Sequence, residues 1–332
     1  RSVQPKQHDF NRLKPNFAFV PVERIKHTLE HTTQYARADA RLPLRKHFKT
    51  RFPAANISRL NEVVATDTFF SDTPAHDDGI MGHGGATIVQ LFSGVTSLLT
   101  AVFPMSSESQ MPGTFEDFIR KYGATKALFS DNAKVQIGNA VRNILRLYSI
   151  ADFQCEPHYQ HQNPAERRIQ DVKKLCNQLM DRTGTLSKYW LLCLEFVTYL
   201  INRLATEKLG WKTPLEQATG QVPDISALLA FRWWEPVYYS TNNGFLSTSP
   251  EKTGRWVGVA DHQGDALTYL ILTDDTNQVL ARSSVRSALD PTNPNLRAEA
   301  PLSTTDLISD GGESEPSTTL GVNRFCTHLM TL

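Results

Sequence analysis

Cysteine is scarce in this chain, and its placement argues against a disulfide-based or zinc-based scaffold. The 332 residues include four cysteines, Cys155, Cys176, Cys193 and Cys326. No two of them have the spacing of a metal-binding pair, and three lie in apolar or helical surroundings. We therefore expect reduced thiols in the core of an intracellular protein.

Long apolar runs are missing as well. The longest candidate, residues 189–204, is interrupted by Glu195, Asn202 and Arg203, and it predicts a buried amphipathic helix rather than a membrane span. No secretory signal peptide is recognisable. The chain starts with Arg1 rather than methionine, which indicates a fragment or a processed product.

The chain has almost no net charge, only +1, but its charges are unevenly distributed. Residues 1–60 carry 13 Lys/Arg against 4 Asp/Glu, a balance of +9, whereas residues 287–332 carry 2 against 6, a balance of −4. A basic N-terminal region indicates a polyanionic partner, although a merely soluble basic terminus would have the same composition. The length allows one to three domains with a sizeable core.

Three carboxylates stand out against these absences. Asp67 follows an apolar run, Asp131 closes a second one, and Glu166 opens a long helical pattern with 34 residues between it and Asp131. Two aspartates on neighbouring strands and a glutamate on a following helix can hold two divalent metals, and carboxylate oxygens are the ligands that Mg²⁺ or Mn²⁺ prefers. Two metals about 4 Å apart promote in-line attack at a phosphorus atom. The alternative is three coincidental structural carboxylates. Asp72, Asp77 and Asp78 follow Asp67 closely, but we do not expect them to be ligands.

The helical pattern after Asn163 separates into two faces at about 100° per residue. One stripe is polar and contains Glu166, Gln170, Lys173 and Asn177, flanked by Arg167 and Lys174. The opposite stripe is apolar and predicts the core contact of the helix: Ile169, Val172, Leu175, Cys176 and Leu179. A carboxylate and lysines on one exposed face predict metal binding at the start of the helix and DNA contacts by Arg167, Gln170, Lys173 and Lys174. An ordinary solvated face is the alternative for the two lysines.

The other elements predict an α/β fold. Strands are expected at 63–70, 86–92 and 98–105 as an antiparallel meander, followed by a helix at 115–122, a strand at 126–130, a helix at 140–148, a strand at 152–156 and the helix after Asn163. This order is the ribonuclease-H-like layout, a mixed sheet with flanking helices. The polar loop before Glu166, with His158, Gln160, His161 and Gln162, either positions DNA ends or is a plain surface loop.

The composition divides the chain into five parts. We expect a basic N-terminal region at 1–60, the mixed-sheet core at 61–210, and a turn-rich linker at 211–234. Short β-rich runs separated by turns predict a small β-rich domain, a barrel or curled sheet, at 235–289. The stretch 290–332 is rich in Pro, Ser, Thr, Asp and Glu and predicts a disordered acidic tail.

The order Asp67–Asp131–Glu166 resembles the catalytic core of retroviral-type integrases. The sequence segments around these carboxylates resemble the copia-type long-terminal-repeat retrotransposon branch. These segments are Thr66-Asp67, Ser130-Asp131-Asn132-Ala133 and Asn163-Pro164-Ala165-Glu166-Arg167. The resemblance spans about residues 61–288. It implies a DDE-type polynucleotidyl transferase and endonuclease that trims the ends of retroelement cDNA and joins them to target DNA. The three carboxylates would be its catalytic metal ligands, for two Mg²⁺ or Mn²⁺ ions.

The resemblance also implies partners and a place of action. Family integrases self-associate, so a homo-oligomer is expected, and they come from a polyprotein that includes reverse transcriptase. The protein would act in a virus-like particle and in the nucleus, without a membrane. Reverse-transcriptase, protease and zinc-knuckle signatures are missing, so the chain is expected to be the integrase part or a remnant of it. An inactive or domesticated DNA-binding protein and a related nuclease are the alternatives.

The chain departs from the family pattern at two places. His27 and His31 are one helical turn apart, as zinc ligands can be, but no cysteine precedes Cys155 and the zinc module is incomplete. We therefore expect two surface histidines and no zinc. Ala133 stands where the wider family usually has glycine.

Overall fold

The computed structural model describes residues 9–36, 51–130, 138–154, 163–241, 249–261 and 263–298. Several residues singled out in the sequence lie outside these ranges: Asp131, Asn132, Ala133, Cys155, His158, Gln160, His161, Gln162 and Cys326. The expected acidic tail lies outside them from residue 299 onward. Within the described residues, no helix is both long and apolar enough to cross a membrane.

The elements alternate as the sequence predicts. The helices are η1 (Phe10–Phe17), α1 (Val22–His31), α2 (Pro53–Asn56), η2 (Glu108–Gln110), α3 (Met111–Tyr122), α4 (Asn139–Leu147), α5 (Pro164–Thr183), η4 (Ser187–Tyr189), α6 (Trp190–Ile201), η5 (Glu207–Leu209), α7 (Pro214–Thr219) and α8 (Ser226–Ala230). The strands are β1 (Arg59–Phe70), β2 (Ile88–Gly94), β3 (Thr100–Met105), β4 (Ala124–Ser130), β5 (Ala151–Gln154), β6 (Pro236–Ser240), β7 (Glu251–Val259), β8 (Tyr269–Thr273), β9 (Val279–Arg282) and β10 (Val285–Ser287).

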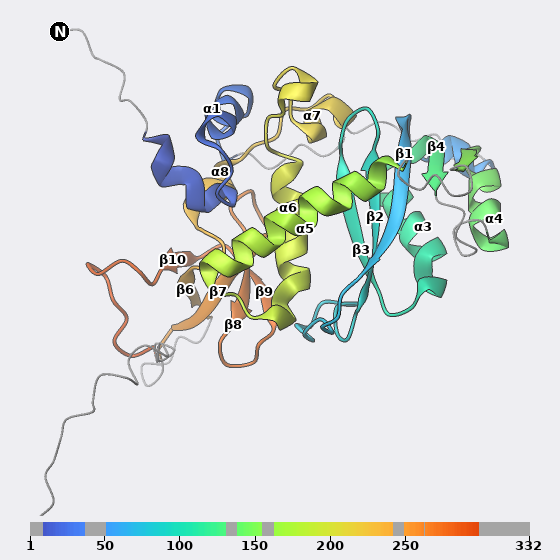
Figure 1. The fold of residues 1–332 in the computed structure, drawn as a ribbon. Coiled ribbons are helices and arrows are strands. Elements are labelled where there is room, and N and C mark those ends of the chain that lie inside the picture. Colours follow the sequence, from blue (N-terminus) through green and yellow to red (C-terminus); the bar gives the residue numbers. More distant parts are fainter. Residues whose placement is uncertain are drawn as a thin grey trace, which may run out of the picture. The chain divides into compact units, whose positions relative to one another are not determined.

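The first sheet is mixed and has the strand order β3-β2-β1-β4-β5. Strands β1, β2 and β3 form the expected antiparallel meander, and β4 and β5 add in parallel on the other side of β1. Figure 1 shows α5 and α6 on one side of this sheet and α3 on the other. The prediction of a mixed α/β sheet with flanking helices is therefore confirmed.

The two faces of β1 belong to two hydrophobic clusters. Ala65 and Phe69 pack with residues of α5 and α6, whereas Leu60 and Val64 pack with α3 and α4. Since successive side chains of a strand point to opposite faces, Asp67 shares the α5 side with Ala65 and Phe69. The face of the sheet that carries Asp67 is thus the face that α5 covers.

Helix α5 starts and ends with the expected signals. Asn163 is its N-cap, Pro164 is its first residue, and Gly184 ends it in the left-handed conformation at φ 66°. The apolar stripe is correct, because Ile169, Val172, Cys176 and Leu179 are buried and Leu175 is half-buried. The polar stripe is correct as well, with Glu166, Gln170, Lys173 and Asn177 exposed.

Two local expectations need correction. Strand β1 begins at Arg59 rather than Val63, and Asp67 lies three residues before its end at Phe70. The segment expected to be a turn-rich linker contains two short helices, α7 and α8. Thr213 caps α7 with its hydroxyl oxygen, which accepts from the backbone N–H of Glu216 at 3.1 Å, and Pro214 and Gly220 delimit the helix.

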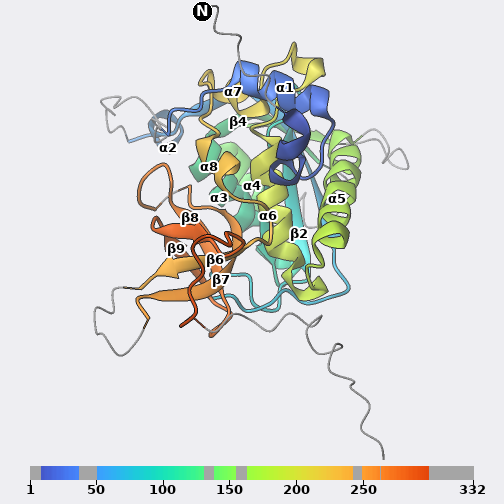
Figure 2. The same cartoon turned by 90° about the vertical axis from the view of Figure 1, so that its left-hand side faces the viewer.

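The second sheet is antiparallel, with the strand order β10-β6-β7-β8-β9, and it confirms the expected small β-rich part (Figure 2). Its apolar side joins the cluster on α6. Trp256 lies edge-on to Phe196 with ring centroids 5.3 Å apart, and Trp233 stacks on Phe196 at 5.1 Å. The two sheets therefore share one continuous hydrophobic cluster around α6.

A buried histidine fixes the loop between β1 and β2. His83 is 2 % exposed, and its Nδ1 lies 2.9 Å from Asp78 Oδ2 while its Nε2 lies 3.0 Å from Glu195 Oε1 of α6. Burial alone would lower the pKa of His83, but the hydrogen bonds and charges of the two carboxylates raise this pKa to about 10. The imidazole is therefore a cation at neutral pH and links the loop to α6.

The same loop reaches the second sheet. The carbonyl oxygen of Asp78 accepts from the backbone N–H of Val279 in β9 at 2.7 Å. The loop also contacts α6, because the carbonyl oxygen of Thr73 accepts from the indole of Trp190 at 2.8 Å. A turn lies at residues 81–85 in the middle of this loop, where Gly82 and Gly85 have φ of 88° and 73°.

Candidate active site

The strands that carry the two aspartates lie side by side. In the parallel pair of β1 and β4, Thr66 is aligned with Ser130, the last residue of β4. Asp67 follows Thr66 in the chain, as Asp131 follows Ser130. Asp131 itself lies outside the described residues, so its carboxylate stays a sequence-based prediction.

Asp67 is half-buried and lies on the face of β1 that α5 covers. Its Oδ1 accepts a hydrogen bond from the backbone N–H of Thr68 at 2.8 Å. On the opposite face of β1, a network missed in the sequence holds the strand. Gln90 of β2 is fully buried, donates to Thr66 Oγ1 at 2.6 Å and accepts from Thr68 Oγ1 at 2.6 Å. The residues before and after Asp67 are thus tied to β2.

Asn163 joins the start of α5 to β1 beside Asp67. Its side chain is buried, and its Nδ2 donates to the carbonyl oxygen of Thr66 at 3.1 Å. Its Oδ1 accepts from the backbone N–H of Ala165 at 3.0 Å and so caps the helix. Glu166 lies in the first turn of this helix, three residues after the cap.

A second contact ties α5 to β1 further along. Lys173 Nζ lies 4.8 Å from the ring centroid of Phe69, two residues beyond Asp67. Because α5 touches β1 at Thr66 through Asn163 and at Phe69 through Lys173, the helix follows the strand past Asp67. Glu166 lies between the two contact residues of α5, as Asp67 lies between those of β1.

Arg168 holds the first turns of α5 from a third direction. Its Nε donates to Thr100 Oγ1 at 2.6 Å and its Nη2 donates to the carbonyl oxygen of Leu98 at 2.9 Å. Burial, followed by the nearby charge of Arg24, lowers the pKa of Arg168 to about 10, so the guanidinium stays charged at neutral pH. Arg168 is not among the site residues predicted from the sequence.

The residues present suit hard divalent cations. Glu166 is exposed and forms no ion pair with any described residue, and Asp67 supplies a second carboxylate on the covered face of the sheet. Carboxylate oxygens from separate elements are what Mg²⁺ and Mn²⁺ bind. The predicted DNA-contacting residues Arg167, Gln170, Lys173 and Lys174 are all exposed on α5.

This arrangement makes a geometric prediction. In a crystal structure with Mn²⁺, the carboxylates of Asp67, Asp131 and Glu166 should converge within roughly 10 Å, because joint ligands of two ions about 4 Å apart cannot lie further away. Anomalous scattering from Mn²⁺ would locate the ions. Ions bound away from Asp67, or Asp131 pointing to the α3 side of the sheet, would contradict this site.

Comparisons with known proteins find relatives among retrotransposon polyproteins. The chain is 27% identical over 138 residues to the retrovirus-related Pol polyprotein from transposon RE2 of Arabidopsis thaliana, covering 40% of this chain and 9% of the relative. It is 22% identical over 185 residues to the corresponding polyprotein from transposon RE1 of the same plant, covering 52% of this chain and 12% of the relative. The chain is thus similar to parts of two retrotransposon Pol polyproteins. The predicted resemblance to a retrotransposon polyprotein is confirmed at this level, and the integrase activity is a proposal.

Solved structures also resemble this chain at low sequence identity. A chain of the simian T-cell lymphotropic virus intasome in complex with PP2A regulatory subunit B56 gamma has a TM-score of 0.39 at 15% identity, over 70% of this chain and 84% of that chain. The HTLV-2 integrase catalytic core domain in complex with magnesium has a TM-score of 0.37 at 15% identity, over 48% of this chain and 96% of that chain. No model of a known protein family matches this chain.

A separate cluster of side chains lies on α1. His27, Glu30 and His31 place ligand atoms within 4.8 Å of one another. His27 already contacts two carboxylates, Glu23 at 3.3 Å and Glu30 at 3.1 Å, and its ring stacks on Trp211 with centroids 3.7 Å apart. His31 is the last residue of α1. The expectation that this part binds no zinc stays a prediction.

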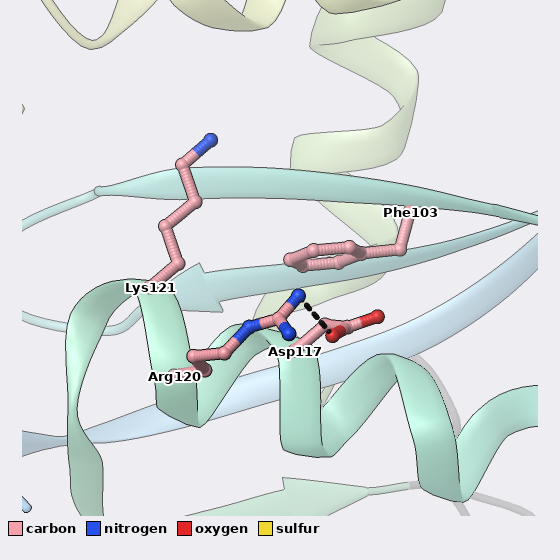
Figure 3. A pocket seen from close by; sticks show the side chains of 4 residues that line it. All are labelled: Phe103, Asp117, Arg120 and Lys121. Carbon is pink, nitrogen blue, oxygen red and sulfur yellow. Dashed lines mark ion pairs between the residues drawn. The ribbon is translucent and has the colours of Figure 1, made fainter. Parts of the chain in front are cut away.

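A cavity of about 370 Å³ lies elsewhere, on the α3 side of the sheet. Its lining residues are Phe103, Asp117, Arg120 and Lys121. Figure 3 shows Arg120 directed at Asp117 beneath the ring of Phe103, and their ion pair measures 2.7 Å. None of the predicted site residues lines this cavity, because Asp67 and α5 lie on the other side of the sheet.

Proposed function

We propose that this chain is the integrase part of a retrotransposon Pol polyprotein, a metal-dependent enzyme that processes the 3′ ends of element cDNA and transfers them into host DNA. The observation that carries the proposal is the bond from Asn163 to the backbone of Thr66. It brings the helix of Glu166 to the strand of Asp67, next to the end of β4 from which Asp131 follows. The chain spans about a tenth of its Pol relatives, so the activity is proposed for this part alone.

The proposed chemistry uses few protein groups. Asp67, Asp131 and Glu166 would hold two Mg²⁺ or Mn²⁺ ions, which activate a nucleophile and stabilise the charge that develops on the phosphate in strand transfer. The work of the chain is to hold three carboxylates at a fixed separation and to bind DNA beside them. The networks around Thr66, Thr68 and Asn163 supply the first requirement. The exposed cations of α5 supply the second.

The partners and the place of action follow from the same proposal. The substrates would be retroelement cDNA ends and target DNA, bound by a homo-oligomer in a virus-like particle and then in the nucleus. The parent polyprotein would carry reverse transcriptase, and the element would belong to the copia-type branch. The retrovirus-related Pol relatives support the polyprotein context.

A strand-transfer assay tests the function. The full chain is incubated with blunt oligonucleotides that match the element ends, a target plasmid and Mn²⁺. Joined products support the integrase. Cleavage without joining favours a related nuclease, and DNA binding without cleavage or joining favours an inactive or domesticated DNA-binding protein. Either of these two results would overturn the proposal.

Lys173 provides a prediction about the DNA contact. Lys173→Ala should weaken DNA binding and flatten its salt dependence by about one unit of slope, since a lysine bound to phosphate releases counterions. Fluorescence anisotropy at several salt concentrations measures this slope. Folding should change little, because the side chain is exposed and its contact with Phe69 is a surface cation–π contact worth about 0.5–1 kcal/mol.

Lys188 is the matched control for Lys173. It also lies over an aromatic ring, with Nζ 4.9 Å from the centroid of Tyr189, but it comes after α5 has ended. Lys188→Ala therefore removes the same kind of contact away from Glu166. Equal slopes for wild type and Lys173→Ala would assign Lys173 to an ordinary solvated face.

A further inference from the structure

We propose that Asn163 is a positioning residue that sets the separation between the carboxylates of Asp67 and Glu166. The inference rests on the proposed function, since it concerns the same metal site. Asn163 touches neither a metal nor DNA in this proposal. It acts through the first turn of α5 and through the backbone of β1.

The two ends of the Asn163 amide have different partners. Its oxygen caps its own helix by accepting from Ala165 N at 3.0 Å, and its nitrogen leaves the helix and donates to Thr66 O at 3.1 Å. The side chain is 4 % exposed, so water does not compete freely for either bond. The oxygen starts α5, and the nitrogen determines where on β1 the helix starts.

The position of Thr66 gives this bond its significance. Thr66 is the last residue of β1 that pairs with the described part of β4, and Asp67 is the next residue. The side-chain amide of Asn163 therefore takes up a β1 carbonyl at the point where the described pairing ends. On the helix side, the carbonyl oxygen of Asn163 accepts from Glu166 N at 3.2 Å, so the cap and Glu166 are linked within one turn. Only this short path of bonds separates the two carboxylate-bearing residues.

The chain itself shows that capping does not require such a link. Thr213 caps α7 through its hydroxyl, which accepts from Glu216 N in the same helix. Serine is about as good as asparagine at the N-cap position, and threonine is a weaker but still favoured cap, although both lack the second, amide end. Asn163→Ser should therefore keep the start of α5 and remove the bond to Thr66.

The experiment measures Mn²⁺ binding directly, by electron paramagnetic resonance on the full chain without DNA. Wild type should bind Mn²⁺, and Asp67→Asn should abolish this binding. Asn163→Ser should weaken this binding by about 10-fold or more, the effect typical of residues that orient metal ligands. In strand transfer, the half-saturating Mn²⁺ concentration should rise by the same factor, and turnover should recover when Mn²⁺ is raised.

Folding is controlled separately. Circular dichroism should give wild-type helix content for Asn163→Ser, and Asn163→Thr offers a second favoured cap should the serine variant be poorly folded. Asn61→Ser is the matched control, because it makes the same substitution at an exposed position near the other end of β1. It should leave Mn²⁺ affinity unchanged.

The outcomes separate the two proposals. Wild-type Mn²⁺ affinity in a folded Asn163→Ser or Asn163→Thr protein would overturn the positioning role and leave the integrase proposal standing. Mn²⁺ binding that Asp67→Asn does not affect would overturn both. A loss of stability with unchanged Mn²⁺ affinity would make Asn163 a structural cap only, which also overturns the inference.

Discussion

Asp67→Asn, Asp131→Asn and Glu166→Gln are each expected to reduce strand transfer at least about 1,000-fold while leaving the fold intact. Each change removes one anionic ligand with almost no change in shape. The metals' stabilisation of the transition state amounts to several kcal/mol, and each 1.36 kcal/mol lost slows the reaction about tenfold. Turnover with Mn²⁺ and element-end oligonucleotides measures the loss, and circular dichroism measures the fold.

Asp72→Asn is the matched control for these carboxylate variants. Asp72 lies five residues after Asp67 in the loop that follows β1, and it is exposed. It carries the same charge close to the site, yet it is not expected to bind metal. Near-wild-type turnover in any one of the three carboxylate variants would show that this residue is not a ligand.

The largest effect on stability is expected at His83. His83→Gln should lower the free energy of unfolding by about 3–5 kcal/mol at pH 6, as is typical when one partner of a buried ion pair is removed. Glutamine retains hydrogen-bonding capacity but carries no charge, so Asp78 and Glu195 lose the cation between them. Urea denaturation of the two proteins measures the difference.

The pH dependence of this difference has a definite sign. The pKa of His83 is about 10 in the folded chain against an ordinary value of 6.5, so the folded state binds the proton more tightly. The stabilisation is therefore complete below pH 6.5 and is lost progressively as the pH rises to about 10. The difference in unfolding free energy between wild type and His83→Gln should shrink over this window.

The control for the pH experiment is His31→Gln, at an exposed histidine of α1. It should change the unfolding free energy by less than about 0.5 kcal/mol, as surface substitutions usually do. A difference between wild type and His83→Gln that stays constant from pH 6.5 to 10 would contradict a protonated His83 in the folded chain.

The features that depend on local residue periodicity could be predicted from the sequence. The two faces of α5 follow from residue spacing, and the structure buries Ile169 and Val172 and exposes Glu166 and Lys173. The meander of β1 to β3 follows from the succession of β-rich runs, although only the connection between β2 and β3 is a short turn. The starts of β1 and of α3 were placed too late by several residues, because strand and helix boundaries depend on pairing and packing partners that local composition does not contain.

Long-range polar contacts could not be predicted from the sequence. Glu195 was noticed only as an interruption of an apolar run, but its partner His83 lies 112 residues away. Asn163 was identified as the start of a helix, whereas its bond to Thr66 spans 97 residues. Gln90 gave no signal, since a glutamine in a strand has the same pattern whether it faces solvent or a buried threonine. The position of the Asp131 carboxylate stays a prediction.

Two buried cysteines allow the packing of α5 against α6 to be monitored by thiol reactivity. Cys176 of α5 and Cys193 of α6 are both buried, and Cys193 Sγ lies 3.8 Å from the carbonyl oxygen of Cys176. Burial, with the neighbouring Cys176, raises the pKa of the Cys193 thiol, so its reactive thiolate is rare while the helices are packed. With Cys155 and Cys326 replaced by serine, the rate of alkylation would count how often α5 leaves α6. That rate measures the transient opening of the helix that carries Glu166, with no dye, DNA or metal added.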